Sequence, residues 1–293
     1  MSAVSNSETI FCNENGYYSI YQSDRYGFNN PDNEWDKKKI EYLLVGDSFT
    51  HGACVNRPYD ISSILRNLSN KSVLNLGYTG NGPLIEYATL REYLDTNVKK
   101  VLWIYYEGND LVNLGSEKTN DILINYLKDL NFTQNLKLNK NDIDSFLSNK
   151  IQEIIKEEEK RATFDSKLIK FIKIYNTRFL ILSALALAPA PAPAPEFKQI
   201  LQLTKELVNK NNTKLYFVYL PEYSRYKITY ENTQYNLVKE IVNELRIPFI
   251  DIHKEVFVKE QNTLKLFPFE LHGHYNVEGY KKVAETIYKF TKD

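Results

Sequence analysis

The sequence predicts a three-layer α/β/α domain with a central parallel sheet of about five strands and a helical insertion. Short apolar runs of strand length recur along the chain, and segments with the apolar spacing of helices lie between them. Strands that alternate with helices form parallel sheets through right-handed crossovers. The chain has 293 residues, of which 43% are hydrophobic and 25% charged, so it can bury a large core.

The expected elements follow one another from residue 40 to the C-terminus. Short apolar runs of strand character cover 40–45, 72–76, 101–105, 214–220 and 248–252. Helical patterns cover 58–68, 83–96, 233–245 and 277–290. Pro58 is expected in the first turn of its helix, where its missing N–H costs little. Residues 1–40 are rich in turn-forming Asp, Asn, Gly and Pro, so they are expected to form an irregular lead-in to a domain spanning 41–293.

Residues 111–187 carry helical patterns and no good strand. The charged segment 141–160 has apolar residues on one stripe, and 166–187 is a second amphipathic stretch. We interpret the region as a helical insertion, which is either a lid over the site or helical packing with no role in substrate choice. Residues 188–195 alternate Ala and Pro, a composition that favours an extended connector, natural or engineered.

The charge balance and the composition of the chain limit the classes of partner that it is expected to bind. Lys plus Arg and Asp plus Glu number 37 each, so no long-range field attracts nucleic acid or anionic membrane, and a neutral or weakly charged substrate is expected. No apolar run reaches the length of a membrane span, and the N-terminal residues do not resemble a signal peptide. Cys12 and Cys54 form no metal or redox motif; they are either one disulfide or two buried thiols.

Four polar motifs lie at the ends of the expected elements. The string GDSFTHG places Ser48 directly after the first strand, where open α/β sheets bind ligands, with its N–H beside a helix start. Its neighbours Asp47, Thr50 and His51 are expected to be structural. Gly80 lies in a glycine-rich turn after the second strand, and either directs its N–H toward the site or only forms a tight turn.

Asn109 follows the third strand, where its amide either stabilises an oxyanion or caps a helix. His274 lies in the string HGHYNVEGY, just before the last helix. A single histidine is more often structural than catalytic, but a serine nucleophile elsewhere makes a base more plausible. His253, in IDIHKE, is expected to mark the end of the last strand.

The order of Ser, Gly, Asn and His in these motifs resembles the SGNH/GDSL hydrolase family, over about residues 40–105 and 214–293. The strings SDRYGFNNPD, GDSFTHGACV, YYEGNDL and FPFELHGHYNVEGY also resemble a bacterial subgroup associated with acylation of surface polysaccharide. The resemblance implies the flavodoxin-like fold of the family. It implies Ser48 as nucleophile, His274 as base, and an oxyanion hole formed by Ser48, Gly80 and Asn109.

One position departs from the family pattern. The family commonly has an Asp three residues before the base, but this chain has Leu271 there. We therefore expect either Glu270 to act as the acid or a main-chain carbonyl to orient His274 in a Ser–His dyad.

The expected function is a serine esterase that removes O-acyl groups from a carbohydrate without a metal or organic cofactor. Alternatives are an O-acyltransferase that uses the same acyl-enzyme and a glycan-binding domain with a decayed site; a lipase is less favoured. The resemblance favours the periplasm or cell surface, whereas the missing signal peptide favours the cytoplasm.

Overall fold

The computed structural model describes residues 2–164, 194–227 and 230–292. The chain divides into two compact units. The first contains residues 1–137 and 191–293, and the second contains residues 138–190. Among the described residues no helix combines the length and apolar character that crossing a bilayer requires.

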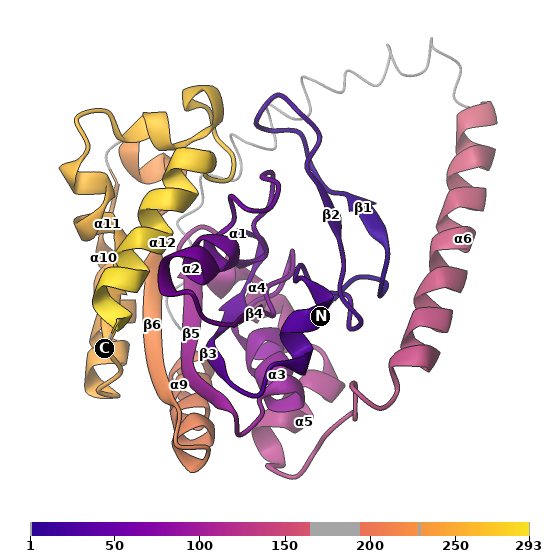
Figure 1. The fold of residues 1–293 in the computed structure, drawn as a ribbon, viewed down its shortest axis with the longest axis horizontal. Coiled ribbons are helices and arrows are strands. Elements are labelled where there is room, and N and C mark those ends of the chain that lie inside the picture. The colour runs from indigo at the N-terminus through magenta and orange to yellow at the C-terminus, as the bar shows by residue number, and fades with distance from the viewer. Residues whose placement is uncertain (1, 165–193, 228–229, 293) are drawn as a thin grey trace. The chain divides into compact units, whose positions relative to one another are not determined.

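A five-stranded parallel sheet forms the centre of the first unit (Figure 1). Its strands, in spatial order, are β4 (Val73–Asn75), β3 (Ile40–Gly46), β5 (Val98–Tyr106), β6 (Lys214–Leu220) and β7 (Phe249–Asp251). Every neighbouring pair is parallel. The predicted sheet is thereby confirmed. After β3 the chain forms β4 on one side of it and then crosses to form β5 on its other side. The boundary between β3 and β5 is therefore the topological switch point, where such sheets bind ligands.

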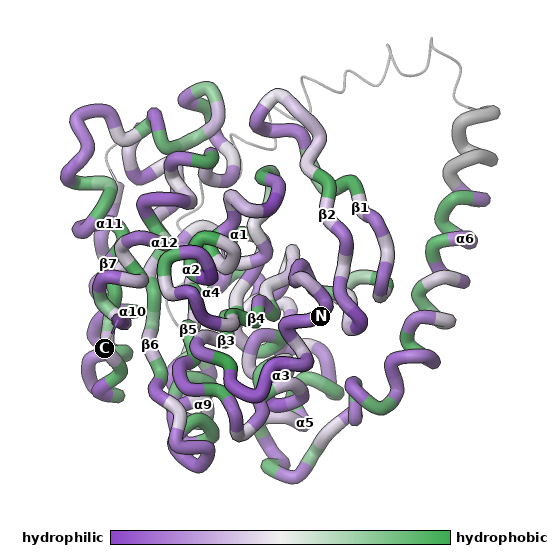
Figure 2. Tube along the Cα trace, viewed as in Figure 1, coloured by the Kyte–Doolittle hydropathy of each residue, from purple (hydrophilic) through white to green (hydrophobic). Residues whose placement is uncertain are grey.

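Helices cover both faces of this sheet. Alternate strand residues point to opposite faces, and the buried side chains accordingly form two separate clusters. One cluster contains side chains of α3 (Pro83–Tyr93), α9 (Pro195–Lys210) and α10 (Thr233–Glu244). The other contains side chains of α2 (Ile61–Ser69) and α12 (Val277–Thr291). Figure 2 shows apolar stretches along β5 and β6, and the two clusters on either face of the sheet complete the three layers.

The predicted insertion is divided between the two units. Helices α4 (Asp110–Glu117) and α5 (Asp121–Lys128) pack against α3 in the first unit. The Arg91 guanidinium, on α3, fixes the last turn of α5 and the segment after it by donating to four backbone carbonyl oxygens, those of Tyr126, Asp129, Leu130 and Phe132. Residues 111–137 therefore belong to the first unit, together with the sheet.

The second unit contributes one described helix, α6 (Lys140–Phe164), over the predicted charged segment. The predicted helix over 166–187 and most of the connector 188–195 lie outside the described residues. Pro195 is the first residue of α9, where a proline needs no intrahelical hydrogen bond.

The lead-in is more ordered than the sequence predicts. Residues of β1 (Glu8–Ile10) and β2 (Ile20–Gln22) pair as an antiparallel hairpin. Strands of three residues carry too little alternation to be seen in a sequence. The expected start of helix α2 is also wrong: Pro58 precedes it, because Asp60 caps it by accepting the Ser63 N–H at 2.9 Å.

The remaining elements are single turns. They are α1 (Ser48–His51), α11 (Ile252–Glu255), η1 (Asp32–Asp36), η2 (Tyr223–Tyr226), η3 (Phe257–Lys259), η4 (Thr263–Leu266) and η5 (Pro268–Glu270).

Candidate active site

Ser48 lies at the carboxyl edge of β3, as its first position after the strand predicts. It is the first residue of the short helix α1, which begins because the Asp47 carboxylate accepts the Phe49 N–H at 2.9 Å. Gly46 allows this turn: a Cβ there would lie 2.6 Å from the Ile104 carbonyl oxygen on β5. The turn therefore places Ser48 at the sheet's switch point, with 7% of its surface exposed.

His274 reaches Ser48 from the loop before α12. Its Nε2 lies 2.8 Å from Ser48 Oγ. The loop is fixed on both sides of the imidazole: Tyr275 is fully buried and donates its hydroxyl to the Pro221 carbonyl oxygen at 2.6 Å, and Asn276 caps α12. The Phe49 ring packs against the imidazole with 4.7 Å between ring centres. The structure thus brings together the two residues predicted as nucleophile and base.

The carboxylate beside His274 belongs to Glu14, in the loop between β1 and β2. Both its oxygens lie 3.1 Å from His274 Nδ1, and Oε2 accepts the His274 backbone N–H at 2.6 Å. An ionised carboxylate can only accept, so Nδ1 carries the hydrogen and Nε2 is left to accept the Ser48 hydroxyl. Burial raises the pKa of Glu14, but the hydrogen bonds and charge of His274 lower it by more, so its pKa falls below 4.5.

The expectation for Glu270 is wrong. Its side chain is exposed and its Oε1 accepts a hydrogen bond from Asn262 at 3.1 Å. Glu270 lies in η5 with φ of 52° at Phe269 and 59° at its own position, a turn that directs its carboxylate to Asn262. The alternative dyad is not found either, since Glu14 orients the imidazole.

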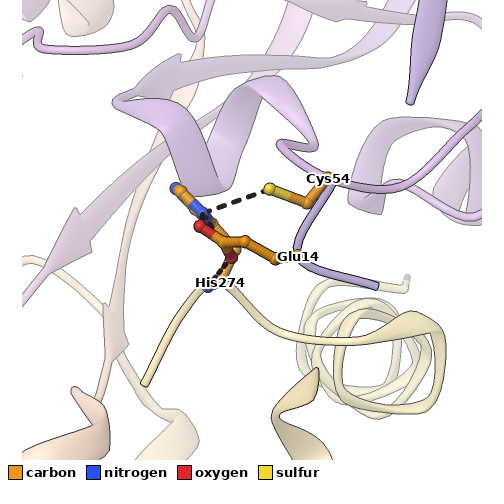
Figure 3. Close-up of side chains that lie close together, drawn as sticks. All are labelled: Glu14, Cys54 and His274. Carbon is orange, nitrogen blue, oxygen red and sulfur yellow. Dashed lines mark hydrogen bonds and ion pairs between the residues drawn. The ribbon is translucent and has the colours of Figure 1, made fainter. Parts of the chain in front are cut away.

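Gly273 makes room for Glu14. A Cβ at Gly273 would lie 2.6 Å from Glu14 Oε2, too close for any side chain. Figure 3 shows Glu14, His274 and Cys54 pointing toward one another, with Cys54 Sγ 3.5 Å from His274 Nδ1. Cys54 is joined to Cys12 by a disulfide, one of the two states left open by the sequence.

Asn109 lies near the nucleophile. It occupies the N-cap position of α4, but its side chain makes no capping hydrogen bond. The side chain therefore does not cap the helix, which was the structural alternative for this residue. Its side chain instead hydrogen-bonds Asp47, the residue before Ser48. Asn109 follows β5 and Ser48 follows β3, so both residues lie at the switch point between these two strands.

Gly80 forms a tight turn. The Asn81 N–H donates to the Tyr78 carbonyl at 3.2 Å, and Gly80 has φ of 76°, as the third residue of a type II turn requires. The Tyr78 N–H donates to the Gly46 carbonyl at 3.2 Å, which holds this turn at the end of β3. The turn is exposed at Gly80, and a role of its N–H toward an oxyanion stays a prediction.

Four buried carboxyl groups, one of them next to Ser48 in the chain, influence one another's ionisation. They are Asp47, Glu86, Asp110 and Glu117. Burial raises the pKa of Asp47 to about 6 and that of Glu117 to about 7. Burial and the neighbouring acids raise the pKa values of Glu86 and Asp110 well above those of ordinary carboxyls. The group should therefore hold protons at pH values where exposed carboxyls are ionised.

Glu86 gives this cluster a testable effect on stability. It is fully buried, and within the described part of the chain neither carboxyl oxygen has a hydrogen-bond partner. Its folded-state pKa is raised, so the unfolded chain releases the proton first and stability falls as pH rises above about 4.5. We expect Glu86→Gln to raise the free energy of unfolding at pH 8 by about 1–3 kcal/mol and to change it much less at pH 5. Urea unfolding at both pH values measures this, and equal effects at both would contradict it.

His51 and His253 were expected to be structural, and both lie against aromatic side chains. His51 is buried among the rings of Phe11, Tyr21 and Tyr78, and burial lowers its pKa to about 4. The His253 Nδ1 lies 2.8 Å from the Tyr226 hydroxyl.

One group of side chains has the spacing of metal ligands among the described residues. Potential ligand atoms of Glu14, Cys54 and His274 lie within 4.8 Å of one another. Metals bind a cysteine as its thiolate, but the Cys54 sulfur is in a disulfide. The Nδ1 atom of His274 is already hydrogen-bonded to Glu14. The group therefore does not fit a metal while the disulfide is intact.

Glu14 is the site residue that the sequence analysis missed. It lies two residues after Cys12, and Cys54 lies six after Ser48. Had the cysteines been taken as paired, the lead-in would have been brought to the nucleophile, with Glu14 as its nearest acid. A disulfide was one of two alternatives for these cysteines, so the sequence contained the clue to Glu14 but did not show that the cysteines pair.

Comparison with known proteins gives a likeness in structure only. No family model and no curated protein matches the chain. Among solved structures, a putative lipolytic protein of the G-D-S-L family from Desulfitobacterium hafniense is 14% identical, with 86% of this chain and 99% of that chain covered and a TM-score of 0.47. The acetyl xylan esterase AlAXEase is 12% identical, with 86% and 99% covered and a TM-score of 0.48.

A lipase/acylhydrolase from Enterococcus faecalis is 14% identical, with 86% and 94% covered and a TM-score of 0.46. These neighbours are of the kind that the motifs resemble. At such identities and scores they carry no information on the substrate of this chain.

Proposed function

We propose that the protein is a serine ester hydrolase that forms an acyl-enzyme on Ser48. The observation that supports this most is the chain of hydrogen bonds from Ser48 Oγ through His274 to the Glu14 carboxylate. A hydroxyl is a weak nucleophile until an oriented base takes its proton, and here the base is in turn oriented by an acid. The three residues come from parts of the chain up to 260 positions apart, a separation that local packing does not explain.

The mechanism follows from these contacts. His274 Nε2 takes the Ser48 proton as Oγ attacks the ester carbonyl, and the Glu14 carboxylate stabilises the imidazolium that forms. The N–H of Ser48, at the start of α1, the N–H of Gly80 and the amide of Asn109 would stabilise the oxyanion. His274 then gives its proton to the leaving alcohol, and a water activated by the same imidazole releases the acid from Ser48.

We further infer that the ester is an O-acyl group, such as acetyl, on a carbohydrate. The two loops that carry Glu14 and precede His274 expose aromatic rings, with 39% of Tyr17, 64% of Tyr18 and 71% of Phe269 accessible. Such rings offer an apolar face to the C–H face of a sugar, and the phenols offer a polar tip. The chain's zero net charge suits an uncharged glycan.

A substrate panel tests this proposal. We expect release of acetate from p-nitrophenyl acetate and, with a higher kcat/KM, from an O-acetylated oligosaccharide; free acetate is measured by an enzyme-coupled assay. Addition of an unacetylated acceptor sugar separates hydrolysis from transfer, because transfer moves the acetyl group to the acceptor and lowers free acetate. Failure to cleave any ester in the panel would contradict the proposed function.

A further inference from the structure

The acid of the proposed site comes from outside the α/β layers. Glu14 lies in the loop of a hairpin whose strands, β1 and β2, have three residues each. An isolated hairpin of this size is marginal in water, so its strands cannot fix the loop by themselves. The position of Glu14 must depend on what ties this loop to the rest of the unit.

Those ties meet one short segment after the nucleophile. The Asn15 side chain donates to the Cys54 carbonyl at 3.0 Å, and the Ile20 N–H donates to the Asn56 side chain at 2.8 Å. Each of these hydrogen bonds is in contact with water and therefore contributes only modestly to holding the loop. The covalent tie is the Cys12–Cys54 disulfide, which closes a loop of 42 residues.

The disulfide also lies at the imidazole itself. Cys12 is two residues from Glu14, and Cys54 Sγ lies 3.5 Å from the same Nδ1 atom that Glu14 contacts. Cys54 is fully buried and has φ of 66°, an uncommon conformation for a residue other than glycine, which its surroundings must hold. Cys12 is only half-buried, so a small reductant can reach the bond.

We propose that the Cys12–Cys54 disulfide is a positioning element of the site: it holds Glu14 against His274, and its reduction releases the carboxylate and disables the enzyme. This inference rests on the proposed function. A dithiol reductant supplies two electrons and two protons, is itself oxidised to a disulfide, and leaves two thiols. The hairpin loop then keeps only its noncovalent contacts, and a free Cys54 thiol competes with Glu14 for Nδ1.

The test compares oxidised and reduced protein. The wild type is reduced with dithiothreitol and desalted under nitrogen into EDTA, which keeps trace metal off the freed thiols; alkylation and mass spectrometry then count two thiols. We expect kcat for p-nitrophenyl acetate to fall on the order of 10²–10⁴-fold, as when a triad loses its acid, and to return on reoxidation. Cys12→Ser should behave like the reduced wild type under both conditions.

The matched control is Glu14→Gln, which should already be impaired and should lose less than two-fold more on reduction. A readout independent of activity is the downfield NMR resonance of the His274 Nδ1 hydrogen, assigned with a His274→Ala variant, which should vanish on reduction while the circular dichroism spectrum and the other resonances persist.

Reduced protein with two counted thiols that keeps both its activity and this resonance would overturn the proposal. If Ser48→Ala were as active as wild type, the proposed function would fail; the resonance alone would then decide whether the disulfide positions Glu14.

Discussion

Replacing Ser48 by alanine is expected to lower kcat for ester hydrolysis by about 10⁴–10⁶-fold. Among the residues that the structure describes, the Ser48 hydroxyl is the group hydrogen-bonded to His274 Nε2, and it has both a proton to give and an oxygen to acylate; the substitution removes that oxygen without disturbing the Asp47 cap of α1. Ser48 is 7% exposed, and its Oγ lies 2.8 Å from His274 Nε2 and donates a long hydrogen bond of 3.5 Å to the Asp47 carboxylate, so little packing is lost and the fold should persist. Steady-state kinetics with p-nitrophenyl acetate measure the loss.

The partner variant His274→Ala should cost about as much, and the double variant little more, because a nucleophile and its base act as a unit. A fluorophosphonate probe gives a second measurement: it should label wild-type protein at Ser48, seen as a mass increase on that peptide, and should not label Ser48→Ala. Substantial hydrolysis by Ser48→Ala, or labelling at another residue, would show that the nucleophile is elsewhere.

The parts predicted well from sequence are those in which local pattern and burial agree. The run KLYFVYL gives the strand β6 (Lys214–Leu220) with its predicted bounds, since a strand buried on both faces is apolar throughout. Ser48, Asn109 and His274 could be placed for a related reason. Ser48 and Asn109 follow the strands β3 and β5, and His274 precedes the helix α12, so these elements of the sheet and its helical layer fix where the three residues lie.

The hairpin and the acid were not predicted because their positions depend on long-range contacts. Glu14 is held by a bond from Cys12 to Cys54 and by a backbone N–H at His274, and no local pattern around residue 14 signals either. Glu270 was preferred because it is near His274 in sequence. Two consecutive residues with positive φ turn it to Asn262 instead, a conformation that sequence patterns outside glycine do not reveal.

Replacing Glu14 by glutamine is expected to lower kcat by up to about 10⁴-fold while leaving KM for a small ester nearly unchanged. The amide has the same size and can still accept the His274 backbone N–H, so the loop should keep its place. It lacks the charge that stabilises the imidazolium, and its NH₂ group competes as a donor for Nδ1, which favours the wrong tautomer. The effect should therefore be on the chemical step, visible in single-turnover kinetics.

Glu270→Gln is the matched control, because it makes the same chemical change four residues before His274 at an exposed position. We expect its kcat to stay within two-fold of wild type.

The pH dependence of activity gives a further expectation, whose direction follows from the pKa of Glu14. The pKa of Glu14 is lowered below 4.5, so its carboxylate is ionised across the neutral range and its help to His274 is lost only as pH falls through that lowered pKa. Titration of the Glu14 carboxyl should thus add no pH dependence to wild-type activity from pH 6 to 8. An equal loss of kcat in Glu270→Gln would indicate that Glu270, the residue near His274 in sequence, is the acid. No loss in Glu14→Gln would show that Glu14 is not the acid of His274.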